Sequence, residues 1–203
     1  MPTPRTLPRK RPRQTRAQDT VEVILEATSR VLGRHGYEGC STNRVAREAG
    51  VSIGSLYQYF PSKEALLAAL SRRRSERMQA VFGERIAKVR DLPLRDAVRE
   101  IIRTELDSYQ NNPAFHRALF EHVPRFERPA HIDAVREEVC RMIAEQLLQR
   151  PDVKVGDPAL ASFLVVNALD GVCQAALRTR SEFLGSPAFL EACTDMVVRF
   201  LAG

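Results

Sequence analysis

Residues 41–60 bring together the side chains of this sequence with the greatest capacity for chemistry. The segment reads STNRVAREAGVSIGSLYQYF and carries hydroxyl, amide, guanidinium and phenol groups within two helical stretches. Such groups can hydrogen-bond to base edges and to phosphates, the two kinds of contact that proteins make with DNA. The pattern therefore indicates a nucleic-acid-binding element, and its local structure decides whether these groups can reach a groove.

The first stretch is predicted to form a helix from Thr42 to Ala49. Ser41 is the expected N-cap, although Arg44 stands where a complete capping box would have Glu. Gly50 can adopt the left-handed conformation that a three-residue turn needs, and Val51 can fill the corner between the two helices.

The second stretch is predicted to form a helix from Ile53 to about Phe60, with Ser52 as its cap. A helical wheel separates an apolar side from a small and polar side. The apolar side is expected to carry Ile53, Leu56 and Phe60, and the outward side Gly54, Ser55, Gln58 and Tyr59. Because little bulk faces outward near the N-terminus, this helix suits a major groove.

The periodic segments elsewhere are also helical, so the predicted fold is all-α, with about nine helices and no strands. An early helix contains Val21 to Leu32 and is expected to stop at Gly33 and Gly36. Ser62 is expected to cap a long helix that ends before Pro93. Later helices are expected to start at Pro93, Asn112-Pro113, Pro129, Asp157-Pro158 and Ser186-Pro187, the last two with a side-chain cap before a first-turn proline.

Positive charge is concentrated at the N-terminus. The chain has 31 basic and 25 acidic residues, and residues 1–16 hold six of the basic residues and none of the acidic ones. The net charge of +6 therefore belongs to one tail. Its prolines and its lack of apolar side chains predict that residues 1–17 form a disordered arm. Near a groove-reading helix we expect the arm to bind phosphates or the minor groove, and a solvated tail is the alternative.

Enzyme, metal-site and membrane classes are not favoured by the remaining residues. There is no Gly-rich phosphate loop, no His-Glu-x-x-His motif, no Cys-x-x-Cys pair and no metal-ligand spacing among the histidines. The longest mostly apolar stretch, residues 159–169, is too short to span a bilayer, and no signal-peptide core follows the basic tail. We therefore expect a cytoplasmic protein without enzymatic activity, cofactor, metal or membrane partner.

Seven short motifs occur together between residues 18 and 66. They are Gly36-Tyr37, Ser41-Thr42, Val45-Ala46, Ala49-Gly50-Val51-Ser52, Gly54-Ser55-Leu56-Tyr57, Tyr59-Phe60 and Ser62-Lys63-Glu64-Ala65-Leu66. In this combination the segment resembles the tetracycline-repressor (TetR) family of one-component bacterial regulators. Beyond residue 66 the resemblance is limited to the number and length of the helices.

The resemblance implies specific contacts with double-stranded DNA. Thr42, Tyr59 and Lys63 are expected to bind phosphates. Ser55 and Tyr57 are expected to reach base edges, including thymine methyl groups. The full candidate set is Thr42, Asn43, Arg44, Ser52, Ile53, Gly54, Ser55, Tyr57, Gln58, Tyr59 and Lys63.

Three parts are expected in the chain: the arm (1–17), a helix-turn-helix DNA-binding domain (18–63), and a ligand-binding and dimerisation domain (64–203). The last two helices are expected to form a homodimer, because a helix that is apolar all round must be covered on two sides. The expected interface residues are Phe163, Val166, Phe189, Cys193, Met196, Val197 and Phe200. A two-fold dimer would bind an inverted-repeat operator, whereas a buried monomer core is the alternative.

A small-molecule effector of unknown chemistry is expected to release this repressor from its operator. Candidate pocket residues lie on central helices and combine apolar bulk with a few polar groups. They are Met78, Phe82, Tyr109, Phe115, Leu119, His122, Phe126 and Met142, and plain core packing is the alternative for each.

Two other functions stay open at this point. A DNA-binding regulator without a small-molecule ligand would have a closed apolar core. A helical protein-interaction module with a nucleic-acid-binding tail belongs to a different class, and it would show no preference for one duplex sequence over another.

Overall fold

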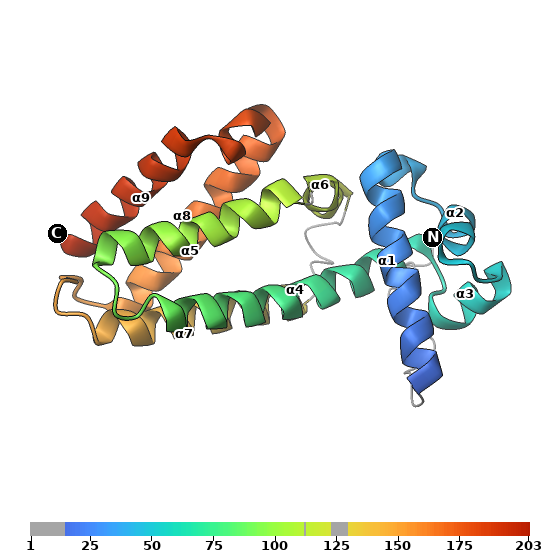
Figure 1. The fold of residues 1–203 in the computed structure, drawn as a ribbon, viewed down its shortest axis with the longest axis horizontal. Helices are drawn as coiled ribbons and strands as arrows, with labels where there is room; N and C mark the ends of the chain where they lie inside the picture. Colours follow the sequence, from blue (N-terminus) through green and yellow to red (C-terminus); the bar gives the residue numbers. More distant parts are fainter. Residues whose placement is uncertain (1–14, 112, 123–129) are drawn as a thin grey trace. The chain divides into compact units, whose positions relative to one another are not determined.

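The computed structural model describes residues 15–111, 113–122 and 130–203. In these ranges it contains nine α-helices, one short 3₁₀-helix (Ser181–Gly185) and no strand, which confirms the predicted all-α fold (Figure 1). The helices are α1 (Thr15–Gly39), α2 (Thr42–Ala49), α3 (Ile53–Tyr59), α4 (Lys63–Lys88), α5 (Leu94–Asn111), α6 (Pro113–His122), α7 (Ala130–Leu148), α8 (Pro158–Thr179) and α9 (Pro187–Ala202).

The chain divides into two compact units. The N-terminal unit comprises Met1–Arg74 together with Pro113–Pro129, and the C-terminal unit comprises Ser75–Asn112 together with Ala130–Gly203. The first turns of α4 and the whole of α6 therefore belong to the N-terminal unit. The domain boundary expected at residue 63 lies inside this unit.

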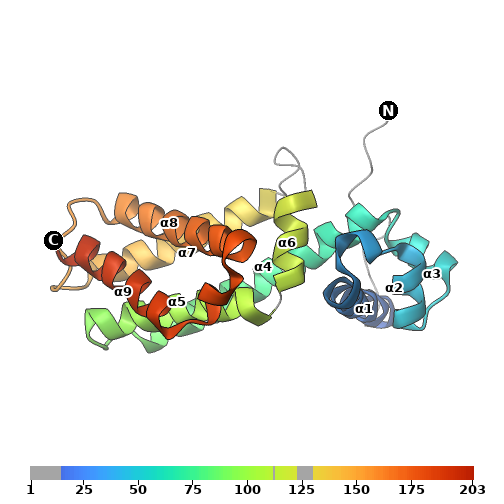
Figure 2. The same cartoon turned by 90° about the horizontal axis from the view of Figure 1, so that it is seen from above.

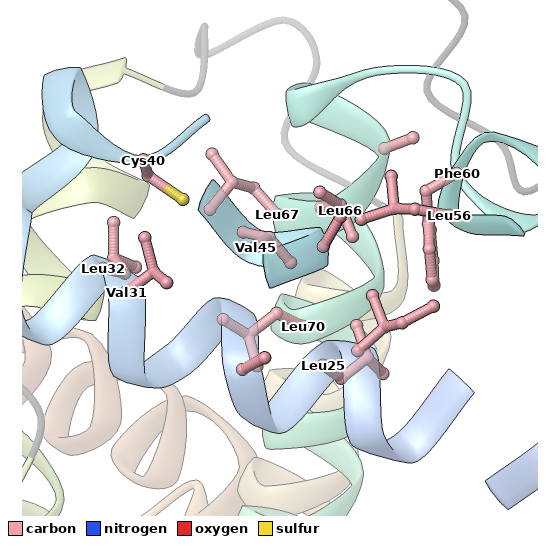
Figure 3. Packing of buried hydrophobic residues seen from close by; sticks show 14 of the residues in the cluster. Leu25, Val31, Leu32, Cys40, Val45, Leu56, Phe60, Leu66, Leu67 and Leu70 are labelled. Carbon is pink, nitrogen blue, oxygen red and sulfur yellow. The ribbon is translucent and has the colours of Figure 1, made fainter. Parts of the chain in front are cut away.

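One apolar core holds the N-terminal unit together, and each of its helices contributes to it. Figure 3 shows Val45 of α2 and Leu56 of α3 near Leu66 of α4, with Leu32 of α1 next to Val31, and the side chains of Leu32, Val45, Leu56 and Leu66 are all fully buried. Phe60, which follows α3 directly, is buried as well. Burial of each such side chain contributes about 1.5–3 kcal/mol to folding, so this core fixes three short elements on one another.

Side-chain caps set the ends of α2 and α3 as predicted. Ser41 Oγ accepts a hydrogen bond from the Arg44 amide at 3.3 Å, and Ser52 Oγ accepts one from the Ser55 amide at 3.0 Å. Gly50 ends α2 with a φ of 67°, in the left-handed region that glycine adopts without a Cβ penalty. The local sequence therefore determines where both helices start and where the turn lies.

The C-terminal unit pairs α7 with α8 and α5 with α9 (Figures 1 and 2). A polar network joins α5, α7 and α8, in which the Tyr109 hydroxyl donates to Asp170 Oδ1 at 2.8 Å and Arg136 Nη2 donates to Asp170 Oδ2. Burial, followed by the charge of Asp170, raises the pKa of Tyr109 far above its ordinary value. Tyr109 therefore remains a protonated donor to the carboxylate.

The predicted caps of the last two helices differ in outcome. Asp157 Oδ1 accepts hydrogen bonds from the amides of Ala159 at 2.9 Å and Leu160 at 3.0 Å, so the prediction is confirmed for α8. Ser186 occupies the N-cap position of α9, but its side chain makes no capping hydrogen bond, so the prediction is wrong there. A proline lies in the first turn of both helices, where its fixed φ favours helix initiation without a side-chain cap.

Helix α8 is longer than the apolar stretch noted in the sequence. By length and composition its 22 residues could cross a membrane, so the expectation that no segment reaches spanning length is wrong. In the structure α8 nevertheless packs along α7, buries Leu169 and Cys173, and holds Asp170 in an ion pair with Arg136. These contacts account for α8 as a packed protein helix.

The orientation of α3 predicts different costs for two truncations on the same helix. Leu56→Ala removes a fully buried side chain and should lower the free energy of unfolding by about 2–5 kcal/mol. Ile53→Ala should change it by less than about 0.5 kcal/mol, because Ile53 is 38% exposed. Urea unfolding followed by circular dichroism measures both, and equal losses would contradict this orientation.

Candidate DNA-binding site

Helices α2 and α3 form a helix-turn-helix. The Val51 amide donates to the Ala46 carbonyl at 3.0 Å and the Gly50 amide donates to the Arg47 carbonyl at 3.2 Å, so the turn closes onto the end of α2. Val51 is half-buried against the N-terminal core, as expected for a residue that fills the corner. The turn and the core together hold α3 in a defined orientation.

Helix α3 presents most of its surface outward. Leu56 is its one buried residue, whereas Ile53, Gly54, Tyr57 and Gln58 are exposed. The helical wheel was therefore wrong for Ile53, which lies outside the core, and for Tyr59, which is partly buried against it. Tyr57 is 41% exposed, in agreement with the resemblance.

Gly54 leaves the start of α3 flat. A Cβ at this position would meet only Ser52 Oγ, at 3.9 Å, so nothing within the protein requires glycine there. The hydroxyls of Ser52 and Ser55 lie 2.8 Å apart beside it. A flat, hydroxyl-bearing first turn can approach another molecule closely.

A hydrogen bond joins the outer surfaces of the two helices. Thr42 Oγ1 at the start of α2 and the Tyr57 hydroxyl on α3 lie 3.1 Å apart. The exposed phenol of Tyr57 is therefore held at a fixed place, while its ring edge stays open. Thr42 can act by positioning Tyr57 as well as by contacting a phosphate.

Lys63, at the start of α4, is fixed against Tyr37. Its Nζ lies 3.7 Å from the centre of the Tyr37 ring and 3.4 Å from the Tyr37 carbonyl oxygen. Burial, followed by the charge of Glu64, raises the pKa of Tyr37 above its ordinary value. The ring remains neutral and supports the ammonium group through a cation–π contact.

The charges of α2 favour an anionic partner. Its acid Glu48 binds Arg30 at 2.8 Å and Arg34 at 3.2 Å, and these contacts, led by the hydrogen bond from Arg30, lower the pKa of Glu48. The carboxylate is thus compensated from α1. Arg44 donates to the Gly39 carbonyl, and Asn43 is exposed beside it.

Sequence reasoning missed Arg47, an exposed base in the last turn of α2. It follows Asn43 by four residues and Arg44 by three, which places all three on one side of a helix. That spacing was the available signal.

Residues 50–54 also match the Gly-x-Ser-x-Gly pattern of hydrolase nucleophiles, which the sequence analysis overlooked. In those enzymes the serine stands on a sharp turn between a strand and a helix, next to a histidine. Here the pattern joins two helices, and Ser52 Oγ caps α3. Ser52 thus caps a helix and does not stand where a hydrolase nucleophile would.

The candidate ligand residues that the structure describes belong to different groups of packed side chains. Met78, Phe82 and Met142 share an apolar cluster, and Tyr109 belongs to the polar network with Asp170. Phe115 lies in the core of the N-terminal unit. Leu119 and His122 belong to α6, but their side chains, like Phe126 as a whole, lie outside the described residues.

A different set of residues lines a cavity within the C-terminal unit. It encloses about 590 Å³, counting the space at its mouth that is open to solvent, between α4, α5, α7, α8 and α9. Thirteen of its sixteen lining residues are aliphatic, and none belongs to the candidate set. The aliphatic ones are Ile86, Val89, Leu94, Ala97, Val98, Ile101, Ile102, Ile143, Leu147, Val165, Leu169, Val197 and Leu201.

The candidate dimer residues divide between surface and interior. Phe163 is 57% exposed, and Met196 and Phe200 are each 45% exposed, whereas Cys193 and Val197 are buried within the protomer. Val166 and Phe189 are half-buried. The surface available to a partner is therefore narrower than the predicted set.

The family comparisons agree with this architecture. The sequence model for bacterial regulatory proteins of the tetR family matches residues 24–70, and that for the tetracycline-repressor-like C-terminal domain matches residues 93–201. The second match alone spans more than half of the chain.

Curated relatives include nucleoid occlusion factors named SlmA. The Haemophilus ducreyi factor is 27% identical over 157 residues, covering 74% of this chain and 75% of that protein. The Glaesserella parasuis factor is 34% identical over 113 residues, covering 55% of this chain and 53% of that protein. The match thus spans about half the length of several of these relatives.

Solved structures with the same fold include three regulators. A TetR-family regulator from Streptomyces coelicolor is 26% identical, with a TM-score of 0.63 and coverage of 90% of this chain and 95% of that chain. A protein from Mesorhizobium loti described as a TetR-family regulator has a TM-score of 0.75 at 20% identity, with coverage of 92% and 96%. FadR from Bacillus subtilis, solved with stearoyl-CoA, has a TM-score of 0.68 at 18% identity, with coverage of 90% and 97%. The chain therefore belongs to the tetR family of bacterial regulatory proteins and is a DNA-binding transcriptional regulator with an N-terminal helix-turn-helix.

Proposed function

We propose that the protein is a cytoplasmic, dimeric repressor that binds an inverted-repeat operator and is released from it by a small molecule. The observation that carries this proposal is the outward surface of α3, where Ile53, Gly54, Tyr57 and Gln58 are exposed around the buried Leu56. A short helix attached to a core by one side can enter a major groove with the other.

The DNA contacts divide into reading and positioning. Ser55 and Tyr57 read base edges, with Ile53 and Gly54 at the closest approach. Lys63 binds a phosphate on the flank, since its ammonium group is already held on Tyr37. Thr42, Asn43, Arg44, Ser52, Gln58 and Tyr59 complete the proposed contact set, and Arg47 joins it.

The basic arm extends this contact along the duplex. Residues 1–16 carry six positive charges, and each neutralised phosphate releases counterions and so strengthens binding at low salt. Residues 1–14 lie outside the described part of the chain, so this step rests on the sequence.

The dimer uses α8 and α9. Phe163, Met196 and Phe200 expose large apolar side chains, and Leu160 and Leu164 extend this surface along α8. Exposed apolar surface of this kind is typical of a protein–protein contact. Cys193 and Val197, which are buried, support the interface from within the protomer instead of contacting a partner.

The effector acts through α4. This helix supplies Leu66 and Leu70 to the N-terminal core, and further along it supplies Ile86 and Val89 to the cavity of the C-terminal unit. A ligand that favours one arrangement of α4 changes operator affinity, and the coupling is reciprocal, typically about 5–150-fold.

A second candidate function follows from the relatives. The SlmA proteins, which are 27–34% identical to this chain, are named for nucleoid occlusion and not for a ligand, so the second candidate is a DNA-binding protein without a small-molecule effector. Operator affinity that no small molecule alters would favour this candidate. Binding without preference for any duplex sequence would favour the interaction-module alternative.

The operator proposal predicts that purified protein enriches genomic fragments that share an inverted repeat. On such a duplex, Gly54→Ala should lower affinity about tenfold, because its methyl group occupies the space where the groove approaches. The fold should not suffer, since alanine favours a helix over glycine by about 1 kcal/mol.

Gly33→Ala is the matched control for this experiment, because a Cβ at Gly33 meets no atom within 4 Å, and one at Gly54 meets only Ser52 Oγ in ordinary contact. This variant should retain full affinity. Unchanged affinity of Gly54→Ala would contradict a close approach of α3, and the absence of any shared inverted repeat would contradict the operator.

The contact between Thr42 and Tyr57 predicts coupled effects on specificity. Thr42→Val and Tyr57→Phe each remove the bond, so each should relax discrimination between the operator and a scrambled duplex. Because they break one interaction, the double variant should lose no more than the stronger single variant. Thr42→Ser keeps the hydroxyl and should retain discrimination. Uniform weakening by Thr42→Val on all duplexes would show that Thr42 contacts only phosphate.

The dimer surface predicts dissociation on charging. Phe200→Asp should yield monomers in sedimentation velocity and reduce operator affinity, because it places a carboxylate in an apolar contact. Val81→Asp changes an equally exposed residue, at 45%, on α4 and should leave the dimer intact. A dimer that survives both Phe200→Asp and Phe163→Asp would place the interface elsewhere.

A further inference from the structure

The cavity of the C-terminal unit is lined by two chemically different kinds of residue. Most of its wall is aliphatic, with Ala97 and Ile101 from α5, Ile143 from α7 and Leu169 from α8 among its residues. Its three polar residues are Arg90, Gln146 and Arg150. Gln146 lies in the last turn of α7, and Arg150 lies two residues beyond its end.

The polar residues lie together. Arg150 Nη1 and Nη2 donate to the carbonyls of Arg90 and Leu92 at 3.3 and 2.9 Å, which ties the end of α7 to the turn after α4. Arg150 also binds Asp152 through two hydrogen bonds of 2.9 Å, so its charge is compensated. The polar end is therefore a built corner, held in place by Arg150.

Arg90 is the uncompensated charge at this corner. Its side chain is exposed, and within the described residues it has no ion pair or hydrogen bond. By contrast, Arg85, Arg95, Arg99, Arg103, Arg136 and Arg141 in the same unit are all ion-paired. A guanidinium at the mouth of an aliphatic cavity favours a ligand with an anionic head.

We propose that this cavity binds a medium-chain fatty acid, with the hydrocarbon chain along the aliphatic wall and the carboxylate at Arg90, next to Gln146. The proposal rests on the proposed function in one respect, because it takes the molecule bound in this cavity to be the effector. Arg90 forms a charge-assisted hydrogen bond to the carboxylate, and the chain displaces water from the apolar wall.

The chemistry of the wall predicts a dependence on chain length. Each buried methylene contributes about fourfold to affinity until the cavity is filled. The charge of Arg90 predicts that affinity depends on the head group of the ligand. A cationic head group would be repelled by Arg90, and Arg150 beside it is already paired with Asp152. Decanoate should therefore bind more tightly than octanoate, which has a shorter chain. It should also bind more tightly than decan-1-ol and decyltrimethylammonium, which have a neutral and a cationic head group.

Calorimetry with the full-length protein tests this, at ligand concentrations below micelle formation. We expect one decanoate per chain. Arg90→Gln should weaken decanoate about tenfold and leave decan-1-ol unchanged, because it removes a charge-assisted contact. Arg178→Gln is the matched control, since Arg178 is an exposed arginine of α8 outside the cavity, and it should change neither ligand.

A filling variant locates the ligand. Ala97→Leu adds bulk to the cavity wall and should weaken decanoate and decan-1-ol alike, with the helical signal and melting temperature measured to confirm folding. If that variant does not fold, Val98→Leu at the same wall takes its place. Unchanged decanoate affinity in a folded filling variant would overturn the site, as would the absence of saturable decanoate binding to the wild-type protein.

The outcomes separate the cavity from the switch. Equal affinity for decanoate and decan-1-ol would overturn the anionic head group. If decanoate binds at one per chain but its affinity is the same with and without operator duplex, the cavity assignment holds and the effector role fails. If another molecule releases the protein from the operator while decanoate does not bind, the proposed release by a small molecule holds and the assignment of the cavity to a fatty acid fails.

Discussion

The attachment of α3 to the N-terminal core is the constraint on which the DNA-binding surface depends. A helix of seven residues is far below the length at which an isolated helix is stable in water. Its persistence rests on Leu56, its one buried side chain, and on Phe60 directly after it. The cap from Ser52 and the left-handed Gly50 then fix where the helix begins and how the chain enters it. Because one side is held, the exposed residues Ile53, Gly54, Tyr57 and Gln58 are available for recognition.

The groups around α3 are held in place before any partner arrives. Thr42 holds the phenol of Tyr57, and Tyr37 supports the ammonium group of Lys63. Glu48 is compensated by two arginines of α1, so its carboxylate opposes a phosphate less than a free one would. Side chains ordered in the free protein lose less conformational entropy on binding, which leaves more of the interaction energy for affinity and specificity.

Local features of the fold were predictable, and features that depend on tertiary contacts were not. The bounds of α2 and the caps at Ser41 and Ser52 follow from residues within a few positions of one another. The wheel failed at Ile53 and Tyr59 because it assumes an endless helix, whereas both lie at helix ends, where neighbouring elements decide burial. Phe60 lies beyond the end of the helix, with φ of −127° and ψ of 108°, so a helical wheel does not describe the direction of its side chain.

The cavity was harder to predict, for a similar reason. The candidate ligand residues were chosen by chemical type, and chemical type does not say where packing is incomplete. Phe115 fills the N-terminal core, and Met78 and Phe82 belong to the same apolar cluster as Ile86, which lines the cavity, but do not line it themselves. The cavity is lined by Val, Ile, Leu and Ala residues that look like any other core in the sequence. Arg90 lines this cavity and forms no ion pair within the described residues, and coordinates are needed to recognise this combination.

The proposed dimer would account for the composition of α8. Its inner side buries Leu169 and Cys173, while the exposed side chains of its outer side change in size along the helix. Leu160, Phe163 and Leu164 stand exposed at one end, and Ala168, Gly171 and Ala175 are exposed at the other. A Cβ at Gly171 would meet no atom of its own protomer, so this end has room for a neighbour. In a two-fold dimer, a contact between two residues is repeated with the two protomers exchanged. Antiparallel copies of α8 would therefore set the bulky end of one helix against the small end of the other. Helix α8 is apolar enough to span a bilayer, and the proposed dimer would account for this, because its own unit covers one side and a second copy would cover the other.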